Sequence, residues 1–229
     1  MLAHVNQMDL FYEVIGESRP LLMVHGNGED HTVFYEAAEV LKETFCCYLP
    51  DSRGHGQSTP VKEYHYADMA DDMIALMEAL DLTDVTFYGF SDGGIIGLLA
   101  AMKCERITKL IISGANITPK GLRTMAHLRF RIRYFFKKAP LIALMLREPN
   151  ITDSDLTKIH VPTLVTAGDN DLIKEKETRH IARAVAGAQL RILKGEGHAT
   201  YVVHSPKIGE IILDYMGCRH TAEARPPVT

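Results

Sequence analysis

The segment 89–93 reads Gly89-Phe90-Ser91-Asp92-Gly93, and it lies between an apolar, β-branched stretch (85–88) and a stretch of helical composition (94–102). This order predicts a strand, a sharp turn and a helix. A serine at such a turn holds its hydroxyl clear of the backbone, and glycines flank it at two residues' distance because a β-carbon there would clash. The helix N-terminus adds free N–H groups and a partial positive charge. The pattern predicts that Ser91 is a nucleophile.

A base and an orienting acid are expected downstream, because a hydroxyl is a poor nucleophile at neutral pH. The segment 168–171 contains Asp169 and Asp171 and follows the apolar stretch 163–166. His198 follows another apolar stretch, 190–193. Both loops come at the C-terminal ends of predicted strands, where parallel sheets build active sites. His198 is therefore the predicted base, and both aspartates are candidates for the acid.

An oxyanion hole needs two backbone N–H donors. One belongs to the residue after the nucleophile, Asp92, and the other is expected from a glycine-containing loop after an early strand. His25-Gly26-Asn27-Gly28 follows the apolar stretch 21–24, so the Asn27 N–H is the predicted second donor. The Asp92 carboxylate would oppose a developing negative charge, and we expect its side chain to point into the protein.

Strand-like and helical stretches alternate along the chain. Helices are expected at 67–80 and 208–216 from their apolar spacing. Such alternation requires parallel strands joined by crossover helices on both sheet faces, so the predicted fold class is α/β. The predicted strands are 21–24, 45–49, 85–88, 110–112, 163–166 and 190–193, after a hairpin at 3–5 and 10–15.

In order, these motifs resemble the α/β-hydrolase superfamily, in its branch with a short lid. The resemblance spans residues 21 to about 206, nearly the whole chain. It implies a mostly parallel eight-stranded sheet with helices on both faces, Ser–His–Asp catalysis, no cofactor, and ester, amide or related acyl substrates. The matching segments are HGNG (25–28), DSRGHGQS (51–58), GFSDGG (89–94), GDND (168–171) and GH (197–198).

The resemblance also chooses between the two candidate acids. The family places this residue three positions after the glycine of 168–171, which selects Asp171 over Asp169. The predicted catalytic residues are then Ser91, Asp171 and His198, and no metal ligand is predicted.

Other polar residues near these motifs are expected to be structural. His25 is expected to support the oxyanion loop, and His55 to be a scaffold residue of its own turn. Asp51 and Arg53 are expected to pair with each other and fix the loop after the third strand.

The segment 118–159 interrupts the alternation and is expected to form about two helices, where a lid would lie. It divides the chain into a core (1–117 and 160–218), a small helical lid (118–159) and a tail (219–229) expected to be disordered. We expect the lid's apolar stripe to cover the pocket and its basic face to meet solvent; the alternative is that its arginines meet an acidic substrate group or an anionic surface. The stripe consists of Met125, Leu128, Ile132, Phe135 and Phe136.

The length, composition and net charge of the chain favour some classes of protein over others. The chain has 229 residues, of which 46% are hydrophobic and 24% charged, with a formal net charge of −4. These values fit one globular domain and give no reason to expect a nucleic-acid partner. No signal peptide or stretch long enough to cross a bilayer is recognisable, so a cytoplasmic protein without stable membrane insertion is expected. Four cysteines show no paired-ligand spacing, and we expect neither a disulfide nor a metal site.

The predicted function is a serine hydrolase that forms an acyl-enzyme, in the first place a carboxylesterase for small to medium esters. A serine in the turn argues against dehalogenase or epoxide-hydrolase chemistry, which uses a carboxylate nucleophile in this superfamily. The alternatives are hydrolysis of amide or carbon–carbon bonds by the same residues, or a non-catalytic ligand-binding protein on the hydrolase fold. The partner is expected to be a small molecule, and the chain a monomer or homodimer.

Overall fold

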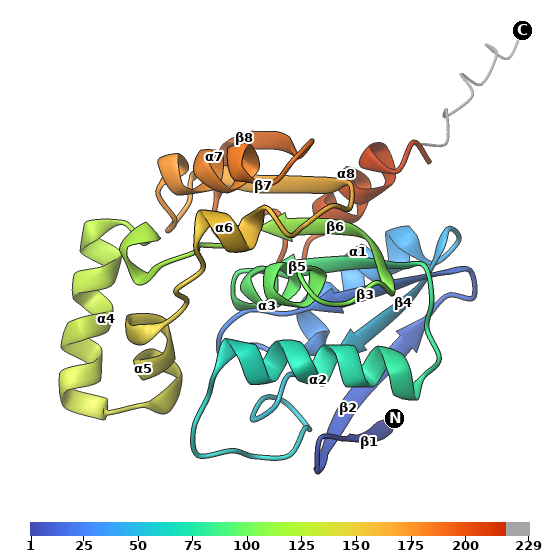
Figure 1. Ribbon diagram of the computed structural model, residues 1–229, viewed down its shortest axis with the longest axis horizontal. Helices are drawn as coiled ribbons and strands as arrows, with labels where there is room; N and C mark the ends of the chain where they lie inside the picture. The colour runs from blue at the N-terminus through green and yellow to red at the C-terminus, as the bar shows by residue number, and fades with distance from the viewer. Residues whose placement is uncertain (219–229) are drawn as a thin grey trace, which may run out of the picture.

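The computed structural model describes residues 1–218, which fold around one eight-stranded sheet (Figure 1). The strand order is β1-β2-β4-β3-β5-β6-β7-β8. β1 pairs antiparallel with β2, and β2 with β4, whereas every pair from β4 to β8 is parallel. The strands are β1 (Leu2–Val5), β2 (Met8–Ile15), β3 (Arg19–Val24), β4 (Phe45–Pro50), β5 (Val85–Phe90), β6 (Ile107–Ser113), β7 (Thr163–Asn170) and β8 (Gln189–Gly197).

Helices cover both faces of the sheet and bury apolar residues against it. α2 (Tyr66–Ala79), α3 (Asp92–Ala101) and α7 (Glu175–Ala184) contribute to one hydrophobic cluster, and α1 (Tyr35–Leu41) and α8 (Lys207–Tyr215) to the other. A short 3-10 helix, η1 (His31–Phe34), leads into α1. The predicted α/β fold with a mostly parallel eight-stranded sheet is confirmed.

The segment between β6 and β7 contains three α-helices, where about two are expected. The elements are η2 (Pro119–Gly121), α4 (Thr124–Lys137), α5 (Pro140–Arg147) and α6 (Asp153–Leu156). Two helices, α4 and α5, form a group at one end of the molecule, whereas α6 lies beside the sheet and contacts α7 (Figure 1). The third helix exists because Thr152 and Asp155 cap its N-terminus reciprocally, a signal that is easily missed in so short a helix.

The orientation of α4 differs from the expectation. Its inward face consists of partly buried Ala126, His127, Phe130 and Tyr134, and no residue of the helix is fully buried. The expectation that the apolar stripe covers the pocket is wrong, because apolar spacing shows only that residues share a face and not which way that face points. All five residues of the predicted apolar stripe are exposed instead: Met125, Leu128, Ile132, Phe135 and Phe136.

Several further expectations concern the chain as a whole. All four cysteines are free thiols. None of the helices in residues 1–218 combines the length and apolar character needed to cross a bilayer. The expectation of a disordered tail at 219–229 lies outside the described residues.

Candidate active site

Ser91 lies at the turn between β5 and α3, in a backbone conformation that side chains rarely adopt (φ 53°). The turn is tight enough to exclude β-carbons on both sides. A β-carbon on Gly89 would overlap the carbonyl of Gly93, and one on Gly93 would overlap the carbonyl of Val24. The two glycines are therefore required by backbone contacts, as the sequence pattern predicts.

Ser91, His198 and Asp171 form a continuous hydrogen-bonded row across three loops. The Nε2 atom of His198 lies 3.0 Å from the Ser91 Oγ, and its Nδ1 atom lies 2.6 Å from an Asp171 carboxylate oxygen. The carboxylate is buried, and the same oxygen accepts the Ile173 N–H at 2.8 Å. An imidazole that carries its proton on Nδ1 donates it to Asp171, which leaves Nε2 free to accept from the Ser91 hydroxyl.

Asp169, the other candidate acid, makes different contacts. Its carboxylate accepts the Gly195 N–H at 2.9 Å and the Asn170 side-chain amide at 3.0 Å. It therefore braces the turn before His198, whereas Asp171 contacts the imidazole.

Asp92 and Asn27, the predicted oxyanion donors, are tied to each other by their side chains. The Asn27 amide donates to the Asp92 carboxylate at 2.8 Å, and the Tyr66 hydroxyl donates to its other oxygen at 2.8 Å. Burial raises the pKa of the Asp92 carboxyl, while these two hydrogen bonds act in the opposite direction. The side chain points into the protein as expected, and its bond to Asn27 holds the 25–28 loop against the start of α3.

The 25–28 loop is also fixed from within the protein. The imidazole of His25 donates from Nδ1 to the Gly26 carbonyl at 2.8 Å and accepts the Ser52 N–H on Nε2 at 3.0 Å. Burial lowers the pKa of His25 to about 4, so the ring is neutral at neutral pH. The Glu29 carboxylate accepts the Gly26 N–H at 3.0 Å.

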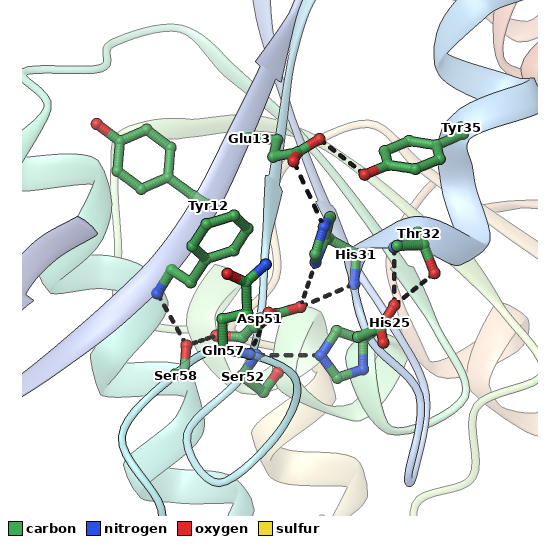
Figure 2. Close-up of polar contacts among 12 residues, drawn as sticks. Tyr12, Glu13, His25, His31, Thr32, Tyr35, Asp51, Ser52, Gln57 and Ser58 are labelled. Carbon is green, nitrogen blue, oxygen red and sulfur yellow. Dashed lines mark hydrogen bonds and ion pairs between the residues drawn. The ribbon is translucent and has the colours of Figure 1, made fainter. Parts of the chain in front are cut away.

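Asp51 lies beside His25 and is fully buried (Figure 2). It accepts hydrogen bonds from the backbone and the imidazole of His31, both at 2.8 Å, and from the Gln57 N–H at 2.8 Å. Asp30, His31 and Asp51 lie close enough to hold a metal ion, but Asp51 already uses its oxygens on these donors. The contacts give this cluster a structural role in joining the loops around His25.

The expected pairing of Asp51 with Arg53 is wrong. The Arg53 guanidinium instead donates two hydrogen bonds to Asp72 of α2, at 2.6 and 2.7 Å, and one to Asp68 at 3.2 Å. The Asp51 carboxylate already accepts from His31 and Gln57, and a planar guanidinium prefers a carboxylate that it can meet with two donors.

A pocket of about 430 Å³ opens above Ser91. Its lining includes Ser91, His198, Asn27 and Asp92. Three further lining residues carry charged side chains: Glu29, Glu148 and Arg133. The insertion supplies most of the apolar wall. The apolar lining residues are Phe90, Leu122, Phe130, Leu141, Ile142, Met145, Leu172 and Ile173.

Comparison with known proteins assigns the family. A family model described as the alpha/beta hydrolase fold matches residues 19–141. The chain belongs to the alpha/beta hydrolase fold family. It is 37% identical over 256 residues to the non-heme chloroperoxidase CPO-A1 of Kitasatospora aureofaciens, with 87% of this chain and 92% of that protein covered. It is 28% identical over 245 residues to the serine hydrolase BPHL of Mus musculus, with 93% and 84% covered.

Solved structures show the same fold. An enol-lactonase from Burkholderia xenovorans matches with a TM-score of 0.79 at 20% identity, covering 95% of this chain and all of that one. A thermophilic esterase from Thermogutta terrifontis matches with a TM-score of 0.76 at 24% identity, covering 92% and 93%.

Several pocket residues of this alpha/beta hydrolase fold protein escape sequence reasoning. Tyr66 and Glu29 bind the Asp92 carboxylate and the Gly26 N–H, but neither stands in a recognisable motif. Gly114 allows His198 to approach, since a β-carbon there would lie 2.8 Å from its Cε1 atom. Gly114 stands two residues after the predicted strand 110–112, outside every motif that the sequence offers.

Proposed function

We propose that this protein hydrolyses carboxylic esters of small to medium size through an acyl-enzyme on Ser91. The observation that carries the proposal is the row of hydrogen bonds from Ser91 through His198 to buried Asp171. Each member is a residue type that nucleophilic catalysis needs, and each comes from a different loop at the same edge of the sheet.

The first half of the proposed cycle forms the acyl-enzyme. Ser91 Oγ attacks the ester carbonyl while His198 Nε2 takes the hydroxyl proton. The carbonyl oxygen becomes an oxyanion, which the backbone N–H groups of Asn27 and Asp92 stabilise. The tetrahedral intermediate collapses, the alcohol leaves with the proton from His198, and the acyl group remains on Ser91.

The second half releases the acid. His198 takes a proton from a water molecule as that water attacks the acyl carbonyl, and the new oxyanion meets the same two N–H groups. The proton then returns from His198 to Ser91 as the acyl bond breaks. Asp171 stays ionised throughout and stabilises the imidazolium that forms twice in each cycle.

The size and lining of the pocket support small to medium esters. A volume of about 430 Å³ lies in the range of small-molecule sites, and its apolar wall suits an acyl or alcohol group without charge. The insertion that carries this wall is the proposed lid.

Labelling with a fluorophosphonate, followed by peptide mapping, tests the proposed nucleophile. We expect labelling on Ser91, its loss in Ser91→Ala and His198→Ala, and a fall in kcat/KM for p-nitrophenyl esters of about 10⁴-fold or more in Ser91→Ala. Ser154→Ala, an exposed serine of α6, serves as the matched control and should keep both label and rate.

Two results would count against the proposal. Full esterase activity in folded Ser91→Ala would remove Ser91 as nucleophile. Labelled Ser91 with cleavage of amides or carbon–carbon bonds, but of no ester in a graded series, would keep the nucleophile and reject the ester substrate.

A further inference from the structure

The outer face of α4 carries the largest exposed apolar side chains of the described chain. Met125 is 68% exposed, Phe135 70% and Phe136 77%, and Leu128 and Ile132 complete the stripe. The inward face of the same helix packs on the protein, so the stripe is directed away from it. Large apolar groups gathered on one exposed face mark an interaction surface, whereas single exposed ones do not.

Basic residues border this stripe on both sides. At about 100° of rotation per residue, Arg129 and Arg131 fall on its two edges, and Arg133 and Lys137 lie further round the helix. Within residues 1–218 no ion pair involves any of these four side chains. The segment 117–147 holds eight of the chain's 25 Lys and Arg residues and none of its 29 Asp and Glu residues, in a protein of net negative charge.

We propose that α4 docks on a lipid surface rich in anionic headgroups. An apolar stripe bordered by arginines is the pattern of a helix that lies in the plane of a membrane interface. The aromatic and aliphatic side chains enter the acyl boundary, and the arginines meet phosphate groups. The docking is peripheral, in agreement with the absence of a helix long enough to span a bilayer among the described residues.

The charge of the helix favours a lipid surface over a second copy of the chain. A two-fold dimer through the stripe would set α4 against its own symmetry mate. Arg129 and Arg131 of one copy would then lie near Arg129 and Arg131 of the other copy. Repulsion between these cations in an interface without water would weaken the dimer. An anionic lipid surface supplies the opposite charge to every one of them.

The docking helix is also a wall of the active-site pocket. Phe130, Arg133 and Leu172 line both the pocket above Ser91 and a second hollow of about 480 Å³ beside the stripe residue Ile132. Docking through α4 would therefore place one wall of the Ser91 pocket next to the lipid surface. The docking inference itself does not depend on the proposed ester hydrolysis.

Co-sedimentation with vesicles tests the inference on the full chain. We expect binding to phosphatidylcholine vesicles that contain phosphatidylserine, weaker binding to pure phosphatidylcholine, and release by salt. Arg129→Gln/Arg131→Gln should lower the partition coefficient on anionic vesicles about 25-fold, since each basic residue contributes about fivefold. Phe135→Ser/Phe136→Ser should lower it at least about tenfold on both vesicle types.

Matched variants separate α4 from general charge and hydrophobicity. Lys176→Gln/Lys194→Gln removes two exposed cations elsewhere, and Leu2→Ser removes an exposed apolar residue from β1; both should bind as the wild type does. No binding to anionic vesicles at low salt, or equal binding by the α4 and control variants, overturns the inference. So does a wild-type dimer that Phe135→Ser/Phe136→Ser converts to a monomer, because the stripe would then be an interface between copies.

Discussion

Ser91 is held in a left-handed conformation by hydrogen bonds on both sides of the turn. Its N–H donates to the Ser113 carbonyl at 2.8 Å, and its own carbonyl accepts the N–H groups of Gly94 and Ile95. A non-glycine residue in this region costs roughly 1–3 kcal/mol, and the surrounding bonds offset that cost. In this conformation the Ser91 hydroxyl lies at the edge of the sheet, 3.0 Å from the Nε2 atom of His198.

Replacement of Asp171 by asparagine tests the orienting acid. The amide cannot stabilise an imidazolium and favours the wrong tautomer of His198, so kcat for ester hydrolysis should fall by about 10⁴-fold. Asp169→Asn, two residues earlier, serves as the control and should change kcat far less, because its carboxylate contacts the Gly195 N–H and not the imidazole. Steady-state kinetics with one p-nitrophenyl ester decides the point, and a larger loss in Asp169→Asn would transfer the role to that residue.

His25 makes the stability of the protein depend on pH. Its pKa is about 4 when folded, against an ordinary value of 6.5, so between these values the unfolded chain binds a proton that the folded protein does not. The free energy of unfolding should therefore fall as the pH is lowered from 6.5 to 4, by up to about 3 kcal/mol from this group.

Urea unfolding across this pH range checks the contribution of His25. His25→Asn should be less stable overall but should lose about one proton's worth of pH dependence. His160→Asn, at an exposed position, should keep the wild-type slope. An unchanged slope in His25→Asn would show that other groups account for the acid sensitivity.

At the scale of elements, α3 approaches β3 as closely as backbone atoms permit. Gly93→Ala would drive a β-carbon into the Val24 carbonyl, and backbone cannot move aside without breaking the sheet. We expect a loss of about 3 kcal/mol or more in unfolding free energy. Gly97→Ala, one turn further along α3, meets the Phe87 ring edge at 2.8 Å, which can shift, and the gain in helix propensity offsets part of that cost. Equal destabilisation of both variants would contradict this distinction.

The strands of the sheet could be predicted from sequence because central parallel strands are buried on both faces and read as apolar runs. β5 is buried throughout its length, and its motif at Ser91 follows directly. The orientation of α4 about its own axis could not be predicted, since it depends on which surface the rest of the chain presents for the helix to pack against. The expected pair of Asp51 and Arg53 is wrong because the partner of Arg53, Asp72, lies on α2 and is remote from it in sequence.

At the scale of the whole molecule, the sheet and the insertion contribute different things to one pocket. Ser91, His198 and Asp171 stand on loops of the sheet, held by the core. Leu141, Met145 and other apolar lining residues come from the insertion, whose helices α4 and α5 lie at one end of the molecule (Figure 1). Loops and insertions on a rigid scaffold vary more readily than the scaffold does. We therefore expect substitutions in the insertion to change which substrate is accepted and to leave the chemistry intact.

Phe130 offers the sharpest test of that division, because its side chain lines both the pocket above Ser91 and the second hollow beside α4. Phe130→Ala should join the two spaces, which measure about 430 and 480 Å³. The preferred acyl chain should then become longer, with kcat/KM rising several-fold for long esters and falling for short ones, while fluorophosphonate labelling of Ser91 persists. Phe135→Ala, an outward residue of the same helix, should keep the wild-type chain-length profile. Two outcomes would contradict the division: an equal shift of the profile in both variants, or loss of labelling in folded Phe130→Ala. Either one would mean that the insertion also holds the groups around Ser91 in place.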